Sequence, residues 1–393
     1  SVLVSNEFGL PLADAKVLLK NNGKTTWINK TDNSGKAELW GNLYSHGEKH
    51  FSIEVEYKGK VYPLEDIALF EKEINKITLP IQCDKLNNAD IMFVVDATGS
   101  MGDEIEYLKA ELKDVIQTVQ GNNKNLNLRL GSVFYRDEGD TYITRTSPLS
   151  DNIETTLAFN NKQRAGGGGD YPEAVHAGLN EAIHQNWSKE AISRIIFLVL
   201  DAPPHYDESK LNSLRKSIQK AAAMGIKIIP ISGSGINRHT EFLLKFMAMS
   251  TNGTYLFLTD DSGIGNPHLK PIVKDYDVEF LNEAMLRLIY YYTRFNGCDN
   301  QQYTLIEKNN TYNNDWGNEL TLFPNPADQY AEIKSKTSIS KISIHDAGGR
   351  LVSNEAPKKK RYRIDTDYLP DGVYTIKIFG DKEFTTKQLM VIH

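Results

Sequence analysis

An acidic residue and two hydroxyl residues follow an apolar strand at alternate positions. Asp96, Thr98 and Ser100 come directly after the apolar run Ile91–Val95. Five consecutive apolar residues are typical of a parallel strand buried on both faces, and ligands of such sheets bind beyond the carboxyl ends of the strands. The three side chains offer only hard oxygen atoms. The pattern therefore predicts a Mg²⁺ site, with Mn²⁺ or Ca²⁺ as alternatives and zinc disfavoured.

The run from Asp96 to Ser100, Asp-Ala-Thr-Gly-Ser, resembles the Asp-x-Ser/Thr-x-Ser signature of von Willebrand factor A domains, which build a metal-ion-dependent adhesion site. The resemblance implies a second contribution from a glycine-rich loop, matched here by Gly166–Gly169 and then Asp170, after an expected strand at Leu128–Phe134. It implies a last acidic ligand at Asp201, after the apolar strand Ile195–Leu200. The implied metal ligands are Asp96, Thr98, Ser100, Asp170 and Asp201.

One position departs from the adhesive members of that family, which usually have Thr where this chain has Asp170. Three ionised aspartates around a divalent cation leave the site net negative, so a carboxylate from a partner should bind more weakly. Alternatively, Asp170 contacts the metal through water, because Mg²⁺ habitually keeps several of its waters.

Two neighbouring residues are weaker candidates for the same site. Asp137 follows an expected strand end and is either an outer contact of the metal or an ordinary turn residue. His205 either hydrogen-bonds a ligand or is a plain loop residue. The four glycines are not followed by Gly-Lys-Ser/Thr, so a phosphate-binding loop is disfavoured.

Residues 83–298 are predicted to form the central domain, because apolar strands alternate there with helical periods. We expect an α/β doubly wound, Rossmann-like fold. Pro172 suits a first helical turn. The expected helices are Glu104–Val119, Pro172–His184, Glu208–Met224, Thr240–Ser250 and Asp277–Tyr292, with strands at Lys227–Ile231 and Thr254–Phe257.

Length and composition predict two or three domains of ordinary globular type, since the chain has 393 residues, 40% hydrophobic and 24% charged. A net charge of −6 gives no general attraction to nucleic acid. The apolar runs are far shorter than the roughly twenty residues that a membrane span requires. Cys83 and Cys298 flank the central domain, and several von Willebrand A domains are closed by a disulfide at their ends. The resemblance implies such a bridge in an oxidising compartment, with two unpaired thiols as the alternative.

Residues 1–82 show short alternating segments, such as Ala15–Leu19 and Phe51–Tyr57, separated by turns. This pattern predicts a β-sandwich. The segments Gly9–Val17 and Thr31–Ala37 resemble the carboxypeptidase-regulatory or Cna-B type of surface module. Such a module would serve as a spacer or as a second contact.

Residues 319–393 carry three motifs in order, Leu322–Ala327, Ile342–Val352 and Leu369–Tyr374. They resemble the C-terminal sorting domain of type IX secretion cargo, and the polar stretch 299–318 is expected to be a linker. The resemblance implies recognition by the type IX outer-membrane translocon and a β-barrel shuttle protein of a Gram-negative bacterium. The protein would then be secreted or held at the cell surface, and a signal peptide is expected in the precursor. We expect a small antiparallel β-sandwich, with Gly348 and Gly372 at turns and with inward-facing Ile342, Ile344, Val373 and Ile376.

These features together predict a secreted or cell-surface binding protein, not an enzyme, whose central domain uses a divalent metal to bind an acidic protein or a polysaccharide. One alternative is a soluble Mg²⁺-dependent phosphatase, because Asp-Ala-Thr-Gly-Ser also resembles the Asp-Lys-Thr-Gly-Thr of phosphoryl-transferring pumps; the Lys is missing here. A second alternative is a structural component of a surface apparatus with a non-adhesive metal site.

Overall fold

The computed structural model describes residues 1–41, 50–64, 67–68, 73–233, 235–258, 281–294, 320–325, 327–345, 351–370, 372–380, 384–391 and 393. The chain divides into two compact units, Ser1–Asp299 and Asn300–His393. The N-terminal region and the central domain therefore belong to one unit.

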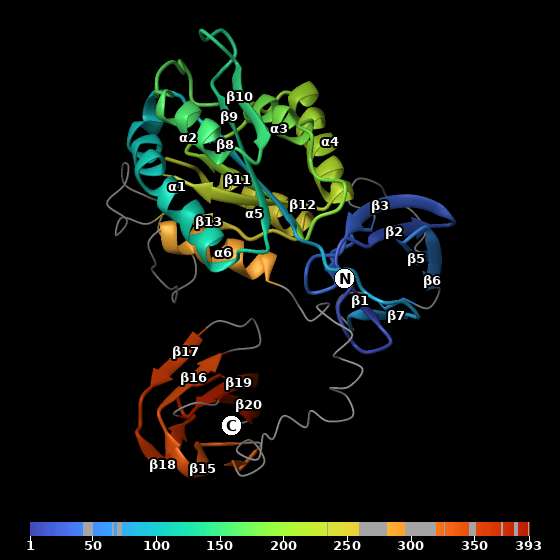
Figure 1. Cartoon of the computed structure of the whole chain (residues 1–393), viewed down its shortest axis with the longest axis vertical. Helices are drawn as coiled ribbons and strands as arrows, with labels where there is room; N and C mark the ends of the chain where they lie inside the picture. The colour runs from blue at the N-terminus through green and yellow to red at the C-terminus, as the bar shows by residue number, and fades with distance from the viewer. Residues whose placement is uncertain are drawn as a thin grey trace. The chain divides into compact units, whose positions relative to one another are not determined.

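A six-stranded sheet is the centre of the first unit (Figure 1). Its strand order is β10-β9-β8-β11-β12-β13, and every neighbouring pair is parallel except β10 with β9. β8 and β11 lie in the middle of the sheet, and every residue of β11 is buried. The strands are β8 (Asn88–Asp96), β9 (Asn127–Tyr135), β10 (Thr144–Ser150), β11 (Ser193–Leu200), β12 (Ile226–Ser232) and β13 (Leu256–Phe257).

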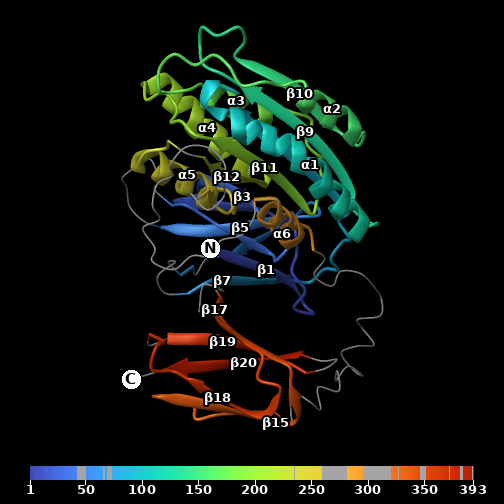
Figure 2. The same cartoon turned by 90° about the vertical axis from the view of Figure 1, so that its left-hand side faces the viewer.

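Helices cover both faces of this sheet and bury a separate apolar cluster on each (Figures 1 and 2). The predicted doubly wound α/β arrangement is therefore observed. One face carries α1 (Gly102–Asn122), α2 (Ile153–Asn161) and α6 (Leu281–Thr293), with a short 3₁₀ turn at Gly99–Met101 before α1. The other face carries α3 (Val175–Ile183), α4 (Glu208–Met224) and α5 (Arg238–Ser250).

Three local expectations were wrong or incomplete. The predicted start of a helix at Pro172 is wrong, because α3 begins at Val175. Glu173 instead donates its N–H to Pro203 O at 2.9 Å and forms a parallel bridge with Pro204. The sequence pattern also missed α2 and the antiparallel strand β10. The first residues of the expected helix Asp277–Tyr292, up to 280, lie outside the described residues.

The N-terminal region is β-rich and consists of two sheets, β4-β1-β7 and β3-β2-β5-β6. Side chains from both sheets, including Val4, Trp27 and Ile53, share one buried cluster, which Ala222 of α4 joins. The strands are β1 (Val2–Asn6), β2 (Lys16–Asn21), β3 (Lys24–Lys30), β4 (Lys36–Ala37), β5 (Phe51–Tyr57), β6 (Lys60–Leu64) and β7 (Asn75–Leu79).

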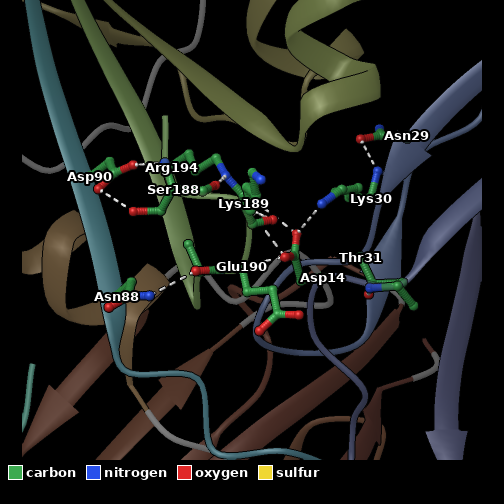
Figure 3. A network of polar contacts seen from close by, with 12 residues as sticks. Asp14, Asn29, Lys30, Thr31, Asn88, Asp90, Ser188, Lys189, Glu190 and Arg194 are labelled. Carbon is green, nitrogen blue, oxygen red and sulfur yellow. Dashed lines mark hydrogen bonds and ion pairs between the residues drawn. The ribbon is translucent and has the colours of Figure 1, made fainter. Parts of the chain in front are cut away.

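A buried ion pair joins the N-terminal region to the central domain (Figure 3). Arg194, at the start of β11, donates from Nη1 and Nη2 to the two carboxylate oxygens of Asp14 at 2.8 and 3.1 Å. Lys30 Nζ donates to the same carboxylate at 2.9 Å, and Arg194 Nε donates to Ser188 O at 2.8 Å. The Arg194 side chain is 3% exposed and that of Asp14 is 8% exposed, so the pair is nearly shielded from water.

Two asparagines extend this contact to the ends of α5 and α6. Asn252, which follows α5, accepts from Glu38 N at 2.9 Å and donates to Lys36 O at 3.0 Å. Asn33 Nδ2 donates to Tyr291 O at 2.8 Å and Arg294 O at 3.2 Å, so it caps the last carbonyls of α6. The N-terminal region is thus bonded to several elements of the central domain rather than tethered to it.

The second unit contains two antiparallel sheets, β14-β15-β18 and β17-β16-β19-β20. Ile342, Ile344 and Ile376 are buried in its core as expected, whereas the side chain of Val373 and all of Gly348 lie outside the described residues. Gly372 is the first residue of a strand rather than part of a turn. The strands are β14 (Thr321–Phe323), β15 (Tyr330–Ile339), β16 (Lys341–His345), β17 (Leu351–Glu355), β18 (Lys359–Asp365), β19 (Gly372–Phe379) and β20 (Phe384–Val391).

Two further sequence expectations concern the cysteines and the membrane. Cys83 is not a free thiol, and Cys298 lies outside the described residues, so the bridge between them stays a prediction.

Among the described helices, none combines the length and the apolar character that a bilayer crossing needs.

Candidate metal centre

Three loops meet at the carboxyl ends of the central strands. The loop after β8 contacts the glycine-rich loop through Gly99 N to Gly167 O at 3.2 Å and Gly166 N to Ala97 O at 3.1 Å. The glycine-rich loop then contacts the loop after β11 through the Glu173–Pro204 bridge. The structure therefore brings together the three segments in which the sequence placed its metal ligands.

Asp96 ends β8 and is fully buried. Its Oδ1 accepts two hydrogen bonds from Thr98, from the backbone N at 2.9 Å and from Oγ1 at 2.7 Å. Its Oδ2 is buried and has no hydrogen-bond partner among the described residues. Burial raises the pKa of Asp96 and the charge of Asp201 adds to the rise, whereas the hydrogen bonds from Thr98 and the nearby hydroxyl of Tyr135 oppose it, so that the pKa is about 7.

Asp201 comes directly after β11 and is 5% exposed. Burial raises its pKa, and a hydrogen bond from Ser100 opposes the rise, so these two predicted ligands lie side by side. Glu104, in the first turn of α1, is also buried close by. A Cβ on Gly233 would lie 3.1 Å from Glu104 Oε1 and 3.3 Å from Asp201 Cβ. The sequence placed Glu104 on a helix without assigning it to the site.

Glu173, not Asp170, is the buried carboxylate of the glycine-rich loop. Asp170 is exposed, whereas Glu173 is 4% exposed. A Cβ on Gly168, which has φ +73°, would lie 3.0 Å from Glu173 Oε1 and 3.3 Å from Thr98 Cβ. Glu173 Oε1 and Thr98 Cβ thus both lie close to Gly168, where a side chain would crowd them.

The causes of the raised pKa of Glu173 identify the carboxylates that lie near it. Burial, together with the charges of Asp96, Asp137, Asp140 and Asp201, raises the pKa of Glu173 to about 8. Asp140 also accepts from Gly168 N at 2.9 Å and so fixes the glycine-rich loop. Two charges on that list, Asp96 and Asp201, are predicted metal ligands. The sequence prediction gave the ligand of this loop to Asp170 and placed Glu173 inside the expected helix Pro172–His184.

The donor set fits a hard divalent cation. Buried carboxylate oxygens without hydrogen-bond partners among the described residues are Asp96 Oδ2, both oxygens of Glu104, Glu173 Oε2 and Asp201 Oδ1. Gathering such carboxylates away from water is unfavourable unless they are protonated or a cation balances them. Within the described part of the chain, no three His, Cys, Asp or Glu side chains converge closely enough to hold one ion by themselves. A metal here would therefore also use the Thr98 and Ser100 hydroxyls and water, as Mg²⁺ commonly does.

The two weaker candidates form a pair next to the site. His205 Nε2 lies 2.6 Å from Asp137 Oδ1. The charge of Asp137 contributes to the raised pKa of Glu173, so this pair lies near the carboxylate cluster. Asp137 is 6% exposed, and its hydrogen bond to His205 connects the loops that follow β9 and β11.

Comparison with known proteins agrees with this architecture. Residues 90–263 match the model of the von Willebrand factor A domain, and residues 321–392 match that of the secretion system C-terminal sorting domain. Over 231 residues the chain is 27% identical to an ariadne-like RING finger protein, R811, of Acanthamoeba polyphaga mimivirus. The aligned region covers 54% of this chain and 20% of that protein. Over 161 residues it is 29% identical to the alpha-protein kinase vwkA of Dictyostelium discoideum. The aligned region covers 40% of this chain and 25% of that protein.

The chain thus spans only a fifth to a quarter of these relatives. Among solved structures, it is similar to BatB from Bacteroides thetaiotaomicron, with 13% identity, a TM-score of 0.33, and coverage of 52% of this chain and 98% of that one.

The sorting domain marks cargo of the type IX secretion system, which is secreted or displayed on the cell surface of Gram-negative bacteria of the Bacteroidetes. The protein therefore combines a von Willebrand factor A domain with a type IX secretion sorting domain, and it is a secreted or cell-surface protein.

Proposed function

We propose that this protein is a metal-dependent binding protein of the bacterial cell surface, and that its central domain holds Mg²⁺ at the carboxyl ends of β8 and β11. The observation that carries the proposal is the cluster of buried, unpartnered carboxylate oxygens on Asp96, Glu173 and Asp201. Asp96, Thr98, Ser100 and Asp201 keep the roles that the sequence suggested, and Glu173 takes the place of Asp170. The metal would supply an electrophilic centre for an oxygen atom of a ligand.

Hydrogen bonds within the chain already hold the proposed ligands in place when no metal is bound. Thr98 orients Asp96 by two hydrogen bonds, and Asp140 holds the glycine-rich loop through Gly168 N. Because these contacts are already made, little reorganisation is needed when a cation enters. Binding without turnover is the proposed activity. The Asp-Ala-Thr-Gly-Ser run lacks the lysine of the phosphoryl-transferring signature that it resembles, which disfavours a phosphatase.

Calorimetric titration of the EDTA-treated full chain with MgCl₂ and MnCl₂ tests the site. We expect saturable binding by the wild type, none by Asp96→Ala, and a loss of at least tenfold in affinity for Glu173→Gln, as for perturbed metal shells. Asp170→Asn is the matched control, because it also removes one charge from the glycine-rich loop but at an exposed position.

Affinity close to wild type is expected for that control. Equal losses in Asp170→Asn and Glu173→Gln would contradict the assignment of Glu173, and unchanged binding in Asp96→Ala would contradict the site as a whole. Circular dichroism of each variant separates loss of the metal from loss of the fold.

A second prediction concerns export of the protein through the sorting domain. A chain without residues 319–393 is expected to remain in the periplasm, because the type IX machinery would no longer recognise it. Fractionation of the native host, followed by immunoblotting, measures this. In the reciprocal control, a periplasmic reporter fused to residues 319–393 should reach the surface or the medium. Unchanged export of the truncated chain would contradict the role given to this domain.

A further inference from the structure

A cavity of 530 Å³ lies where the N-terminal region meets the ends of α5 and α6 (Figure 2). We infer that this cavity is a binding site for an organic cation, that is, a protonated amine or a guanidinium on an apolar stem. None of its described lining residues belongs to the proposed metal centre, so binding there would need no metal. Two features carry the inference: the aromatic walls and a carboxylate oxygen without a partner.

The walls of the cavity are largely apolar and come from both regions. Trp40 follows β4 in the N-terminal region, and Tyr291 and Tyr292 lie in the last turn of α6. Met249, in the last turn of α5, adds a thioether. Aromatic faces attract cations, and the attraction is stronger where water is displaced. The walls therefore favour a ligand that carries a positive charge on an apolar body.

Asp32 supplies an unbalanced negative charge. It lines the cavity and is only 8% exposed. Its Oδ1 accepts three hydrogen bonds within its own turn, from Ser34 N at 2.8 Å, Ser34 Oγ at 2.6 Å and Lys36 N at 3.1 Å. Its Oδ2 accepts none from the described residues. Lys36 Nζ instead pairs with Glu38 at 2.6 Å, so of the three charged side chains in the described lining only Asp32 lacks a counter-ion.

The tyrosine rings already attract cations of the chain itself. Lys227 Nζ lies 5.3 Å from the ring centroid of Tyr292, and Arg294 Cζ lies 4.9 Å from that of Tyr291. Within the described part of the chain, neither cation forms an ion pair with Asp32, and none lies over the ring of Trp40. The Trp40 ring and the Asp32 oxygen thus remain available to a ligand.

An organic cation fits these surroundings better than a neutral or an acidic ligand. A neutral ligand would cover Asp32 and leave its charge buried without a partner, which is unfavourable. An acidic ligand would be repelled by the same carboxylate. An ammonium or guanidinium group would pair with Oδ2, while its stem packs on Trp40 and Met249. A free amine and a lysine or arginine side chain of a partner protein both offer this chemistry.

The cavity is already formed, because hydrogen bonds between the two regions hold its walls. Asn252 bonds to Glu38 N and Lys36 O, and Asn33 Nδ2 bonds to Tyr291 O. The volume of 530 Å³ lies within the range of about 300–1,000 Å³ that is usual for small-molecule sites. A cation bound here would contact both regions and so stabilise their junction.

Calorimetric titration of the EDTA-treated full chain with three five-carbon probes tests the charge preference. Cadaverine carries an ammonium group at each end, pentane-1,5-diol is its neutral counterpart, and glutarate is its acidic counterpart. We expect cadaverine to bind about tenfold or more tightly than the diol, as a hydrogen bond between charged groups predicts, and glutarate not to bind. Nα-acetyl-lysine amide distinguishes the sources: if it binds more tightly than cadaverine, the ligand is a side chain of a partner protein, and otherwise it is a free amine.

Asp32→Asn should weaken cadaverine binding about tenfold or more, because the amide keeps an oxygen for the hydrogen bonds of the turn but loses the charge. Trp40→Leu should weaken it about threefold through loss of the aromatic face. Glu7→Gln is the matched control, since it removes one charge from an exposed position of the N-terminal region, and it should bind like the wild type.

Equal affinity for cadaverine and the diol, no binding of either cation, or unchanged cadaverine binding in Asp32→Asn would each overturn the inference. Circular dichroism shows whether each variant is folded, and the comparison of probes on the wild type holds whether or not a variant folds. Because every titration contains EDTA, failure of the proposed metal centre would leave these results unchanged.

Discussion

Asp14→Ala is expected to destabilise the unit Ser1–Asp299 by about 3–5 kcal/mol, because it leaves the buried guanidinium of Arg194 without its carboxylate. Arg194 donates to both oxygens of Asp14, at 2.8 and 3.1 Å, and its side chain is only 3% exposed. Backbone carbonyls of Ser188 and Lys189 accept its other hydrogen bonds, so the guanidinium is fixed and cannot turn to water. Denaturant unfolding of the full chain, followed by tryptophan fluorescence, measures the loss.

Lys16→Ala is the matched control, since it also breaks an ion pair of the N-terminal region. The Lys16–Glu56 pair lies at 2.7 Å, but its side chains are 39% and 37% exposed. Exposed pairs of this kind contribute about 0–1 kcal/mol. An Asp14→Ala loss no larger than that of Lys16→Ala would contradict the structural role of the buried pair. The double variant Asp14→Ala/Arg194→Met should recover part of the stability, because no uncompensated charge stays buried.

This junction between the two regions could not be predicted from the sequence. The alternation of apolar residues indicated strands in residues 1–82, and the apolar runs indicated the parallel strands of the central sheet. Asp14, however, lies in a turn at φ +61°, and Arg194 stands 180 residues later at the start of a buried strand. Only the tertiary structure brings them together, so local patterns predicted the two regions but not the bonds between them.

Only part of the proposed metal centre could be predicted from the sequence, for a similar reason. Asp96 and Asp201 each end an apolar strand, and strand ends can be read from hydrophobic patterns. Glu173, which we propose as the ligand from the glycine-rich loop, could not be found in this way. Pro172 suggested a helix start, yet the bridge from Glu173 to Pro204 keeps this segment extended. That bridge turns Glu173 inward and leaves Asp170 exposed, and no periodicity within the loop reports it.

In the absence of metal, the protein is expected to lose stability as the pH rises from 5.5 to 8.5. The pKa of Glu173 is raised from 4.5 to about 8, and that of Asp96 from 3.8 to about 7. From pH 5.5 up to these folded pKa values, the folded state therefore holds protons that the unfolded state has released. Stability falls with pH wherever the folded state binds more protons, and the loss is complete above the folded pKa values. The expected loss is on the order of 3 kcal/mol, since the two groups are coupled and their shifts do not add.

Mg²⁺ is expected to reverse this trend. The cation binds the ionised carboxylates of the folded state and releases their protons, so the stabilisation that it gives grows as the pH rises. Thermal unfolding with EDTA and with 5 mM MgCl₂, at pH 5.5, 7.0 and 8.5, measures both effects. The difference in Tm between the two conditions should be smallest at pH 5.5 and reach roughly 5–10 °C at pH 8.5.

Glu173→Gln separates this carboxylate from all other titrating groups. Without metal, the variant should show a flatter pH profile and a higher Tm than the wild type at pH 8.5, because an uncharged amide replaces a buried carboxylate that is forced to ionise. With MgCl₂ it should gain less than the wild type. Asp170→Asn should follow the wild type in both conditions. A metal-free wild type whose Tm stays constant or rises with pH would show that these carboxylates are not held together in the folded protein, and the site would have no reason to attract a cation.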